Sequence, residues 1–177
     1  MQITSEALER AIEELAKLPG TGRKSAQRIA IHLLKQPEEQ VKKLADSLVQ
    51  LKESVMRCSV CGTITDQDPC TICSNFKRKN GVICVVEDFQ DVYIIEKTNE
   101  FLGRYHVLGG TISPLENVGP DNLRIKELLD RIANEDEVVE EIILALNPDA
   151  EGEATSYYIN KLLANYDVKV TRIAYGI

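Results

Sequence analysis

Two closely spaced pairs of cysteines constrain this chain more than any other feature. Cys58 and Cys61 form the first C-x-x-C pair, and Cys70 and Cys73 form the second, with eight residues between the pairs. A segment this short is too small to own a hydrophobic core, and bound zinc can return on the order of 10 kcal/mol of folding energy to it. Four thiolates at this spacing can close a tetrahedral shell around the ion. We therefore expect the four cysteines to bind one structural Zn2+ in a module over residues 57–76.

Redox-active pairs or free thiols are the alternative interpretation of the same pattern. Cysteines in the cytosol normally stay reduced, which favours metal binding over disulfides. No apolar run approaches the roughly 20 residues of a membrane helix, and the first residues include acids and no apolar signal region. We expect a soluble, cytoplasmic protein without a membrane partner. The fifth cysteine, Cys84, lies inside an apolar run and is predicted to be a buried core residue.

Apolar residues recur at helical spacing on both sides of the turn Pro19-Gly20-Thr21-Gly22. The residues that define the two faces are Leu8, Ile12 and Leu15 before the turn, and Ala26, Ile29, Ala30, Leu33 and Leu34 after it. A third helix is predicted from about Glu38 to Val55, with an apolar face of its own. Residues 1–56 are therefore predicted to form a helical domain that begins with a helical hairpin.

The hairpin turn has the composition of an anion-binding site. Its glycines permit a tight turn, and the backbone N–H groups at the start of the following helix face outward without intrahelical partners. Residues 18–37 contain no acid but four Lys and Arg residues, so the local field adds to the helix dipole. An ordinary helical hairpin with a solvated basic face is the alternative. We expect a phosphate group to bind at Gly20, Gly22, Arg23, Lys24 and Arg28.

The charge of the chain is divided unevenly. The net charge is −7, but residues 1–80 hold 13 Lys and Arg against 10 Asp and Glu, a net of +3. Residues 81–177 hold 8 against 18, a net of −10. Because phosphate attracts mainly lysine and arginine, a polyanion is expected to bind the first part, and a basic partner the second.

Beyond Gly81 the pattern changes to alternating strands and helices. Continuous apolar runs predict strands of a mostly parallel sheet at Val82 to Val86, Ile142 to Leu146 and Val168 to Ile173. Crossover helices are predicted at Asp88 to Glu96, Asp121 to Ile132 and Glu151 to Asn165. The chain is thus predicted to be a multi-part α+β protein whose residues 80–177 form an α/β domain.

Acidic residues follow two of these strands directly. Glu87 and Asp88 come after the first strand, and Asn147 followed by the acids Asp149, Glu151 and Glu153 comes after the second. Ligands gather at the carboxyl ends of parallel strands, and converging carboxylates there could bind Mg2+. Solvated acids at helix N-termini, favoured by the dipole, are the alternative. His106 is expected to follow a further strand and to face this acidic cluster.

The same positions resemble the Toprim domain of topoisomerases, primases and some nucleases. That family carries a Glu after its first strand and a D-x-D motif after a later one, which correspond to Glu87 and to Asn147-Pro148-Asp149. Asn147 departs from the pattern, because one metal-binding carboxylate is missing. Two-metal chemistry is therefore disfavoured, and a Mg2+-dependent nuclease or primase-like enzyme is the second hypothesis.

The segment LPGTGRKSAQRIAIHLL resembles the helix-hairpin-helix motif, which grips one DNA strand without reading bases. Hairpin, four-cysteine module and Toprim-like domain in this order resemble the bacterial recombination mediator family RecR over nearly the whole chain. The segments VICVVED, YHVLGGTISPLENVGPDNL, NPDAEGEAT and RIAYGI look like recurrent segments of that family. The resemblance implies a non-enzymatic DNA-repair protein that works with RecO and RecF to load recombinase on gapped DNA.

The family resemblance also implies where partners bind. It places DNA contacts, to single or double strands of any sequence, at Lys24 and Arg28, and RecO contacts at Glu87, Asp149 and Glu151. It implies a homo-oligomer, expected as a ring-shaped tetramer with a dimer as the alternative. Family members continue past RIAYGI with a strand and a helix, so the Toprim domain is expected to be shorter than usual. A protein scaffold that leaves DNA binding to a partner is the third hypothesis.

Overall fold

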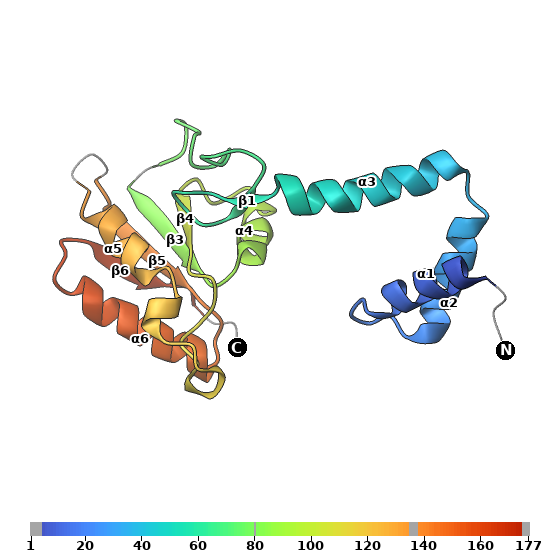
Figure 1. Cartoon of the computed structure of the whole chain (residues 1–177). Coiled ribbons are helices and arrows are strands. Elements are labelled where there is room, and N and C mark those ends of the chain that lie inside the picture. Colours follow the sequence, from blue (N-terminus) through green and yellow to red (C-terminus); the bar gives the residue numbers. More distant parts are fainter. Residues whose placement is uncertain (1–4, 80, 135–137, 175–177) are drawn as a thin grey trace. The chain divides into compact units, whose positions relative to one another are not determined.

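The structure, a computed structural model, describes residues 5–79, 81–134 and 138–174 of the chain. The chain divides into two compact units, Met1–Ser54 and Val55–Ile177. Helices make up the first unit, and the second contains the cysteine segment and a parallel sheet (Figure 1). Within the described residues, no helix is both long and apolar enough to cross a membrane.

A helical hairpin opens the first unit. Helix α1 (Glu6–Ala16) and helix α2 (Arg23–Leu34) pack through Ile12, Ala26 and Ala30, which are buried. The two alanines let the helix backbones approach closely, because they add little side-chain volume at the contact. This confirms the predicted hairpin. The predicted apolar face is too wide, however, since Ile29 and Leu34 are exposed.

Helix α3 (Glu38–Ser54) completes the first unit and ends within one residue of its predicted end. None of its residues is buried, although its sequence is amphipathic. The apolar stripe remains open to solvent, with Leu44, Leu48 and Leu51 exposed to 46%, 60% and 63%. Within the first unit, no described element covers this stripe.

The second unit is built on four parallel strands in the order β4-β3-β5-β6. Their bounds are Val82–Val86 for β3, Arg104–Val107 for β4, Glu141–Ala145 for β5 and Lys169–Arg172 for β6. The predicted parallel sheet is confirmed, and the strand RYHV joins it at one edge. His106 thus lies inside β4, whereas the sequence had placed it after a strand.

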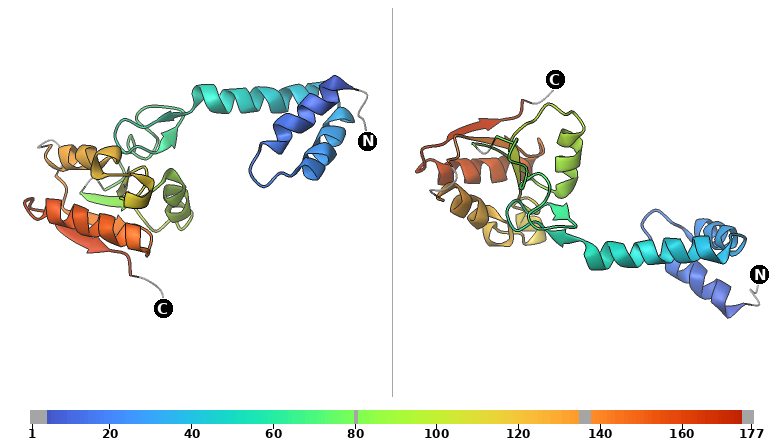
Figure 2. Two further views of the ribbon diagram at one scale, coloured as in Figure 1. Left: turned by 60° about the horizontal axis from the view of Figure 1, so that its bottom comes forward. Right: turned by 90° about the horizontal axis from the view of Figure 1, so that it is seen from above.

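Helices cover both faces of the sheet (Figure 2). Ile83 and Val85 of β3 pack with helix α5 (Ile125–Ile132) and helix α6 (Ala150–Leu163), through Leu128 and Ile159. The alternate residues Cys84 and Val86 pack with Val92 of helix α4 (Phe89–Glu96). Because successive side chains of a strand point to opposite faces, both cores share β3. The predicted burial of Cys84 is confirmed.

Helix α6 begins one residue before and ends two residues before its predicted bounds, and two further differences in the helices have local reasons. The stretch predicted as one helix over residues 121–132 is divided into the 3-10 helix η2 (Pro120–Asn122) and α5, because Leu123 is extended, with φ −107° and ψ 157°. A second 3-10 turn, η1 (Pro114–Glu116), precedes it. Helix α4 begins after Asp88, whose side chain caps it and forms a capping box with Asp91.

Candidate nucleic-acid interface and metal centre

The four cysteines converge in one buried cluster. Their sulfur atoms all lie within 4.8 Å of one another, and the Sγ atoms of Cys61 and Cys70 are 3.7 Å apart. A tetrahedral zinc ion with Zn–S bonds of about 2.3 Å requires sulfur separations of about 3.8 Å. Both the donor set and the spacing therefore fit a zinc ion held by Cys58, Cys61, Cys70 and Cys73.

Backbone hydrogen bonds hold the thiols in this arrangement. Strands β1 (Met56–Arg57) and β2 (Ile64–Thr65) pair in antiparallel fashion beside the first cysteine pair. The turn between them requires Gly62, whose φ is +78°, and the N–H of Gly62 donates to the Cys58 carbonyl at 2.9 Å. The N–H of Cys70 donates to the Cys58 sulfur at 3.3 Å, a contact that favours a thiolate.

The thiols also perturb one another. Hydrogen bonds from Cys61 and Cys73 lower the pKa of Cys70 to about 2, because they stabilise its anion. The hydrogen bond to Cys70 raises the pKa of Cys61 to about 12, and burial adds to the shift. The pKa of Cys73 is raised for the same reasons, first by its hydrogen bond to Cys61. Without a cation, the negative charge on one cysteine opposes ionisation of the others. A divalent cation bound among them would allow all four to be thiolates.

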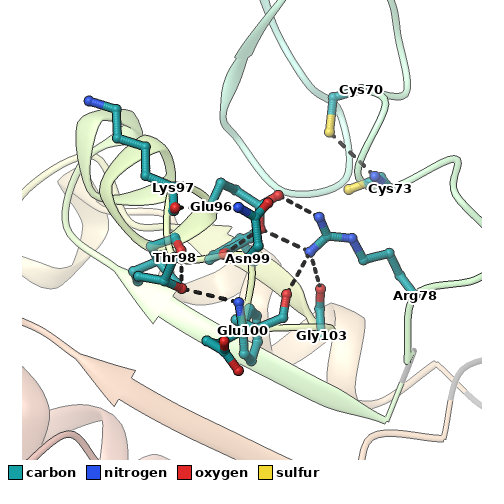
Figure 3. Close-up of polar contacts among 12 residues, drawn as sticks. Cys70, Cys73, Arg78, Glu96, Lys97, Thr98, Asn99, Glu100 and Gly103 are labelled. Atoms are coloured by element: carbon teal, nitrogen blue, oxygen red, sulfur yellow. Dashed lines mark hydrogen bonds and ion pairs between the residues drawn. The ribbon is translucent and has the colours of Figure 1, made fainter.

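An arginine anchors the exit of the cysteine module to the sheet domain (Figure 3). Arg78 forms an ion pair with Glu96 at the end of α4 and donates to the carbonyls of Phe101 and Gly103 at 3.1 and 3.2 Å. The hydroxyl of Tyr105 donates to the same Glu96 carboxylate at 2.6 Å. The hydrogen bond to Glu96 raises the pKa of Arg78. Sequence patterns gave no signal for this anchor, because its partners are 18 to 25 residues away from Arg78.

His106 does not take the place that the sequence suggested. Its ring is fully buried, and its Nε2 is 2.7 Å from the carbonyl oxygen of Arg124, so Nε2 carries the proton and donates. Burial lowers the pKa of His106 to about 4, so the ring is neutral at pH 7. The expectation that His106 faces the acidic residues is therefore wrong, and its role is to pack within the sheet domain.

The hairpin turn exposes an uncapped helix start. Gly20 has φ +74°, and Gly22 is the N-cap of α2, with no side-chain hydrogen bond to the first turn. A Cβ at either glycine would meet nothing within 4 Å, so the surface is open. The first backbone bond of α2 joins the N–H of Ala26 to the Gly22 carbonyl at 2.9 Å. The amides that precede it point out of the helix and can bind an anion.

The basic residues of the hairpin fall into two groups. Arg23 forms an ion pair with Glu9 on α1, which partly offsets its charge. Lys24, Arg28 and Lys35 are exposed, and within the described residues they form no ion pair. At 3.6 residues per turn these three lie within an arc of about 40°, on the side of α2 away from buried Ala26 and Ala30. They form a line of uncompensated positive charge.

The acidic residues at the strand ends each make a separate local contact. Both carboxylate oxygens of Glu87 accept from Asn147, at 2.6 Å from its backbone N–H and 2.7 Å from its side-chain amide. Asp149 caps α6 by accepting from the Gly152 N–H at 2.7 Å, and Glu151 accepts from the Ser113 hydroxyl at 2.5 Å. Within the described residues, the only potential metal-binding cluster is the four cysteines. The arrangement does not fit a Mg2+ ion shared by Glu87 and residue 147.

Comparison with known families defines the class of protein. The RecR helix-hairpin-helix model matches residues 8–52, the RecR four-cysteine zinc finger model matches residues 55–75, and the Toprim model matches residues 81–174. The chain is therefore a three-part protein with a helix-hairpin-helix, a four-cysteine zinc finger and a Toprim domain. The zinc finger coincides with the buried cysteine cluster, so this cluster is its zinc-binding site.

Curated relatives specify the family. Recombination protein RecR of Chlorobium limicola is 52% identical over 181 residues, which cover all of this chain and 88% of that protein. The same protein of Clostridium perfringens is 51% identical over 177 residues, with the same coverage, and that of Chlorobaculum tepidum is 52% identical over 180 residues, again with the same coverage. The chain belongs to the RecR family of recombination proteins, as its sequence segments indicated.

Substitution of one cysteine ligand tests the zinc site. Cys61→Ser is expected to lower the bound zinc, measured by elemental analysis, from one ion per chain to well below one, and to unfold the module, because zinc supplies on the order of 10 kcal/mol to such sites. Circular dichroism and thermal unfolding report the structural loss. The matched control is Cys84→Ala, which removes a buried thiol outside the cluster and should leave the zinc content unchanged. Full zinc binding by Cys61→Ser would contradict the assignment.

Proposed function

We propose that this protein is a recombination mediator that binds DNA without sequence preference and catalyses no reaction. In this proposal it acts in the bacterial cytoplasm with RecO and RecF to load recombinase on gapped DNA. The observation that carries it is the uncapped start of α2 beside Lys24 and Arg28, which have no acidic partner among the described residues. Its membership of a family of recombination proteins supports the same role.

The geometry of the hairpin suits the DNA backbone better than the bases. Outward-facing amides and helix dipoles bind phosphate oxygens, and those contacts carry no sequence information. Lys24 and Arg28 are one helical turn apart, about 6 Å along the axis, and can contact neighbouring phosphates of one strand. Single and double strands both present such phosphates, so both are expected to bind.

Removal of two cations tests the DNA site. Lys24→Ala/Arg28→Ala is expected to weaken binding to every DNA sequence alike, and to reduce the slope of log affinity against log salt by about 2, because each lost phosphate contact removes about 0.9 from it. Fluorescence anisotropy over a salt series measures both quantities. The control Lys42→Ala/Lys52→Ala removes the same charge from α3 and should leave the slope nearly unchanged.

The same reactions distinguish the alternatives. Unchanged binding curves for Lys24→Ala/Arg28→Ala would contradict the hairpin site and favour a scaffold that leaves DNA to a partner. A nicked or cleaved product in the presence of Mg2+ would favour the Toprim nuclease hypothesis, which rests on the position of Glu87 at a strand end. The amide of Asn147 on that carboxylate favours the non-enzymatic hypothesis.

We further propose that RecO binds the acidic edge formed by Glu87, Asp149 and Glu151. Support comes from charge, because residues 81–177 carry a net charge of −10 and complement a basic partner surface. Asp149 is exposed and Glu151 partly so, at the start of α6. Glu87 is half-buried and contributes through its field, since its carboxylate is engaged by Asn147.

Neutralising substitutions test this partner surface. Asp149→Asn/Glu151→Gln is expected to weaken RecO binding about tenfold or more, because complementary charges are lost while oxygen acceptors for the existing hydrogen bonds remain. Pull-down and anisotropy with labelled RecO measure the effect, and DNA binding by the free protein should persist. The control Glu127→Gln/Asp130→Asn removes two charges from α5. Equal RecO binding by both variants would count against the proposed surface.

Finally, we propose that the protein assembles into a homo-oligomer, a tetramer or a dimer, through α3. The support is an apolar stripe of partly buried Val41 and exposed Leu44, Leu48 and Leu51, whose spacing of three, four and three residues is that of a coiled-coil seam. A second copy presents the same stripe, so the two can cover each other in a symmetric contact.

Charge placed on the stripe tests the assembly. Leu48→Glu/Leu51→Glu is expected to reduce the molecular mass measured by light scattering to half or less, because buried carboxylates without partners strongly oppose association. Lys43→Glu, on the far side of α3, is the control and should keep the mass of the unaltered protein. A monomeric mass for the unaltered protein would refute this part of the proposal.

A further inference from the structure

A single glutamate connects the carboxyl ends of three neighbouring strands of the sheet. Glu87 follows β3 directly, and its carboxylate accepts two hydrogen bonds from Asn147, which follows β5. Its backbone carbonyl accepts from the N–H groups of Gly109 and Gly110, at 2.9 and 3.0 Å, in the loop after β4. Glu87 thus links the carboxyl ends of three adjacent strands, and Asn147 makes the link between β3 and β5.

The Asn147 side chain stands where the Toprim pattern has a metal-binding aspartate. Its Nδ2 donates to Oε2 of Glu87 at 2.7 Å, so a hydrogen of the amide meets the carboxylate. In this orientation the amide presents its nitrogen, a donor that cannot ligate a cation, whereas either oxygen of an aspartate could. The other Glu87 oxygen is taken by the backbone N–H of Asn147, at 2.6 Å.

We propose that the Asn147 carboxamide replaces the divalent cation of a Toprim edge, which makes the edge a joint that needs no metal. The neutral amide donates a hydrogen bond to the Glu87 carboxylate and adds no second charge beside it. Glu87 is half-buried, and this burial raises its pKa while the hydrogen bonds from Asn147 oppose the rise. The joint therefore stabilises the anionic form of Glu87 in a place where water has been partly removed.

The backbone of this joint is fixed independently of the Asn147 side chain. A Cβ on Gly152 would lie 2.1 Å from the Asn147 carbonyl oxygen, so the turn into α6 is closely packed around that peptide. The Asp149 side chain closes the same turn by accepting from the Gly152 N–H. An aspartate at position 147 would consequently occupy the place of the amide, beside Glu87 and Asp149.

This geometry predicts a similar loss of stability but different responses to a divalent cation for two substitutions. Asn147→Asp is isosteric but brings a second carboxylate against Glu87, with Asp149 nearby, and such a group of carboxylates is stabilised by a divalent cation. Asn147→Ala removes the amide without adding charge, so it leaves a weakened joint that a cation cannot repair. If the carboxylate at position 147 cannot share an ion with Glu87 and Asp149, both substitutions will be equally insensitive to cations.

The experiment uses the full chain loaded with zinc, with Mn2+ as the probe for binding and Mg2+ for thermal unfolding. Asn147→Asp is expected to lose roughly 5 °C in Tm without a cation, as follows from a lost hydrogen bond to a charged group. Millimolar Mg2+ should restore most of this loss. Electron paramagnetic resonance should show Mn2+ bound to Asn147→Asp at least about tenfold more tightly than to the unaltered protein.

Two control variants test whether the cation response depends on the carboxylates at positions 147 and 149. Asn147→Ala should lose Tm similarly and stay unresponsive to Mg2+, and Asn147→Asp/Asp149→Asn should bind Mn2+ more weakly than Asn147→Asp. If Asn147→Asp folds only when Mn2+ is present, the proposal is supported. Tight Mn2+ binding by the unaltered protein, or no cation response in Asn147→Asp, would overturn it. None of these measurements involves DNA, so their failure leaves the proposed DNA-binding function untouched.

Discussion

The burial of strand β3 on both faces is the constraint on which the second unit depends. Ile83 and Val85 complete one apolar core with α5 and α6, and Cys84 and Val86 complete the other with α4. Each core takes every second residue of one strand, so β3 has no solvent face, and its backbone pairing with β4 on one side and β5 on the other holds its register. That fixed register places Glu87 at the carboxyl end of the strand, where it joins the ends of β4 and β5.

The first unit is nearly neutral, because residues 1–54 hold 9 Lys and Arg against 8 Asp and Glu, and the second carries a net charge of −8, with 12 against 20 over residues 55–177. The positive line on α2 is made of side chains that have no acidic partner in the described residues, and it lies opposite the apolar contact with α1. The acids at the strand ends of the second unit accept hydrogen bonds from neighbouring donors, for example Glu151 from the Ser113 hydroxyl and Asp149 from the Gly152 N–H. A polyanion is thus attracted to this line on α2 and repelled by the net negative charge of the second unit.

The sequence predicts those parts of the molecule whose signals are local. The cysteine spacing, the glycine turn and the apolar runs identified the zinc cluster, the hairpin and the parallel sheet, because each depends on neighbours along the chain. The burial of His106 and the anchor formed by Arg78 and Glu96 depend on residues 18 positions away, and no periodicity reports them. The exposed stripe of α3 illustrates the converse, since an apolar pattern shows that a face needs cover but not what supplies it.

The contact between the cysteine module and the sheet has a consequence for how the protein tolerates metal loss. β4 is an edge strand of the sheet, and the N–H of Val107 donates to the Cys61 carbonyl at 2.7 Å. The module therefore satisfies one of the backbone groups that β4 does not pair with another strand. Ile72 of the module also shields the apolar side that faces α4. If loss of the zinc ion unfolds the module, the edge of β4 and the hydrophobic surface beside it become exposed together. An exposed edge strand next to hydrophobic surface promotes aggregation of β proteins.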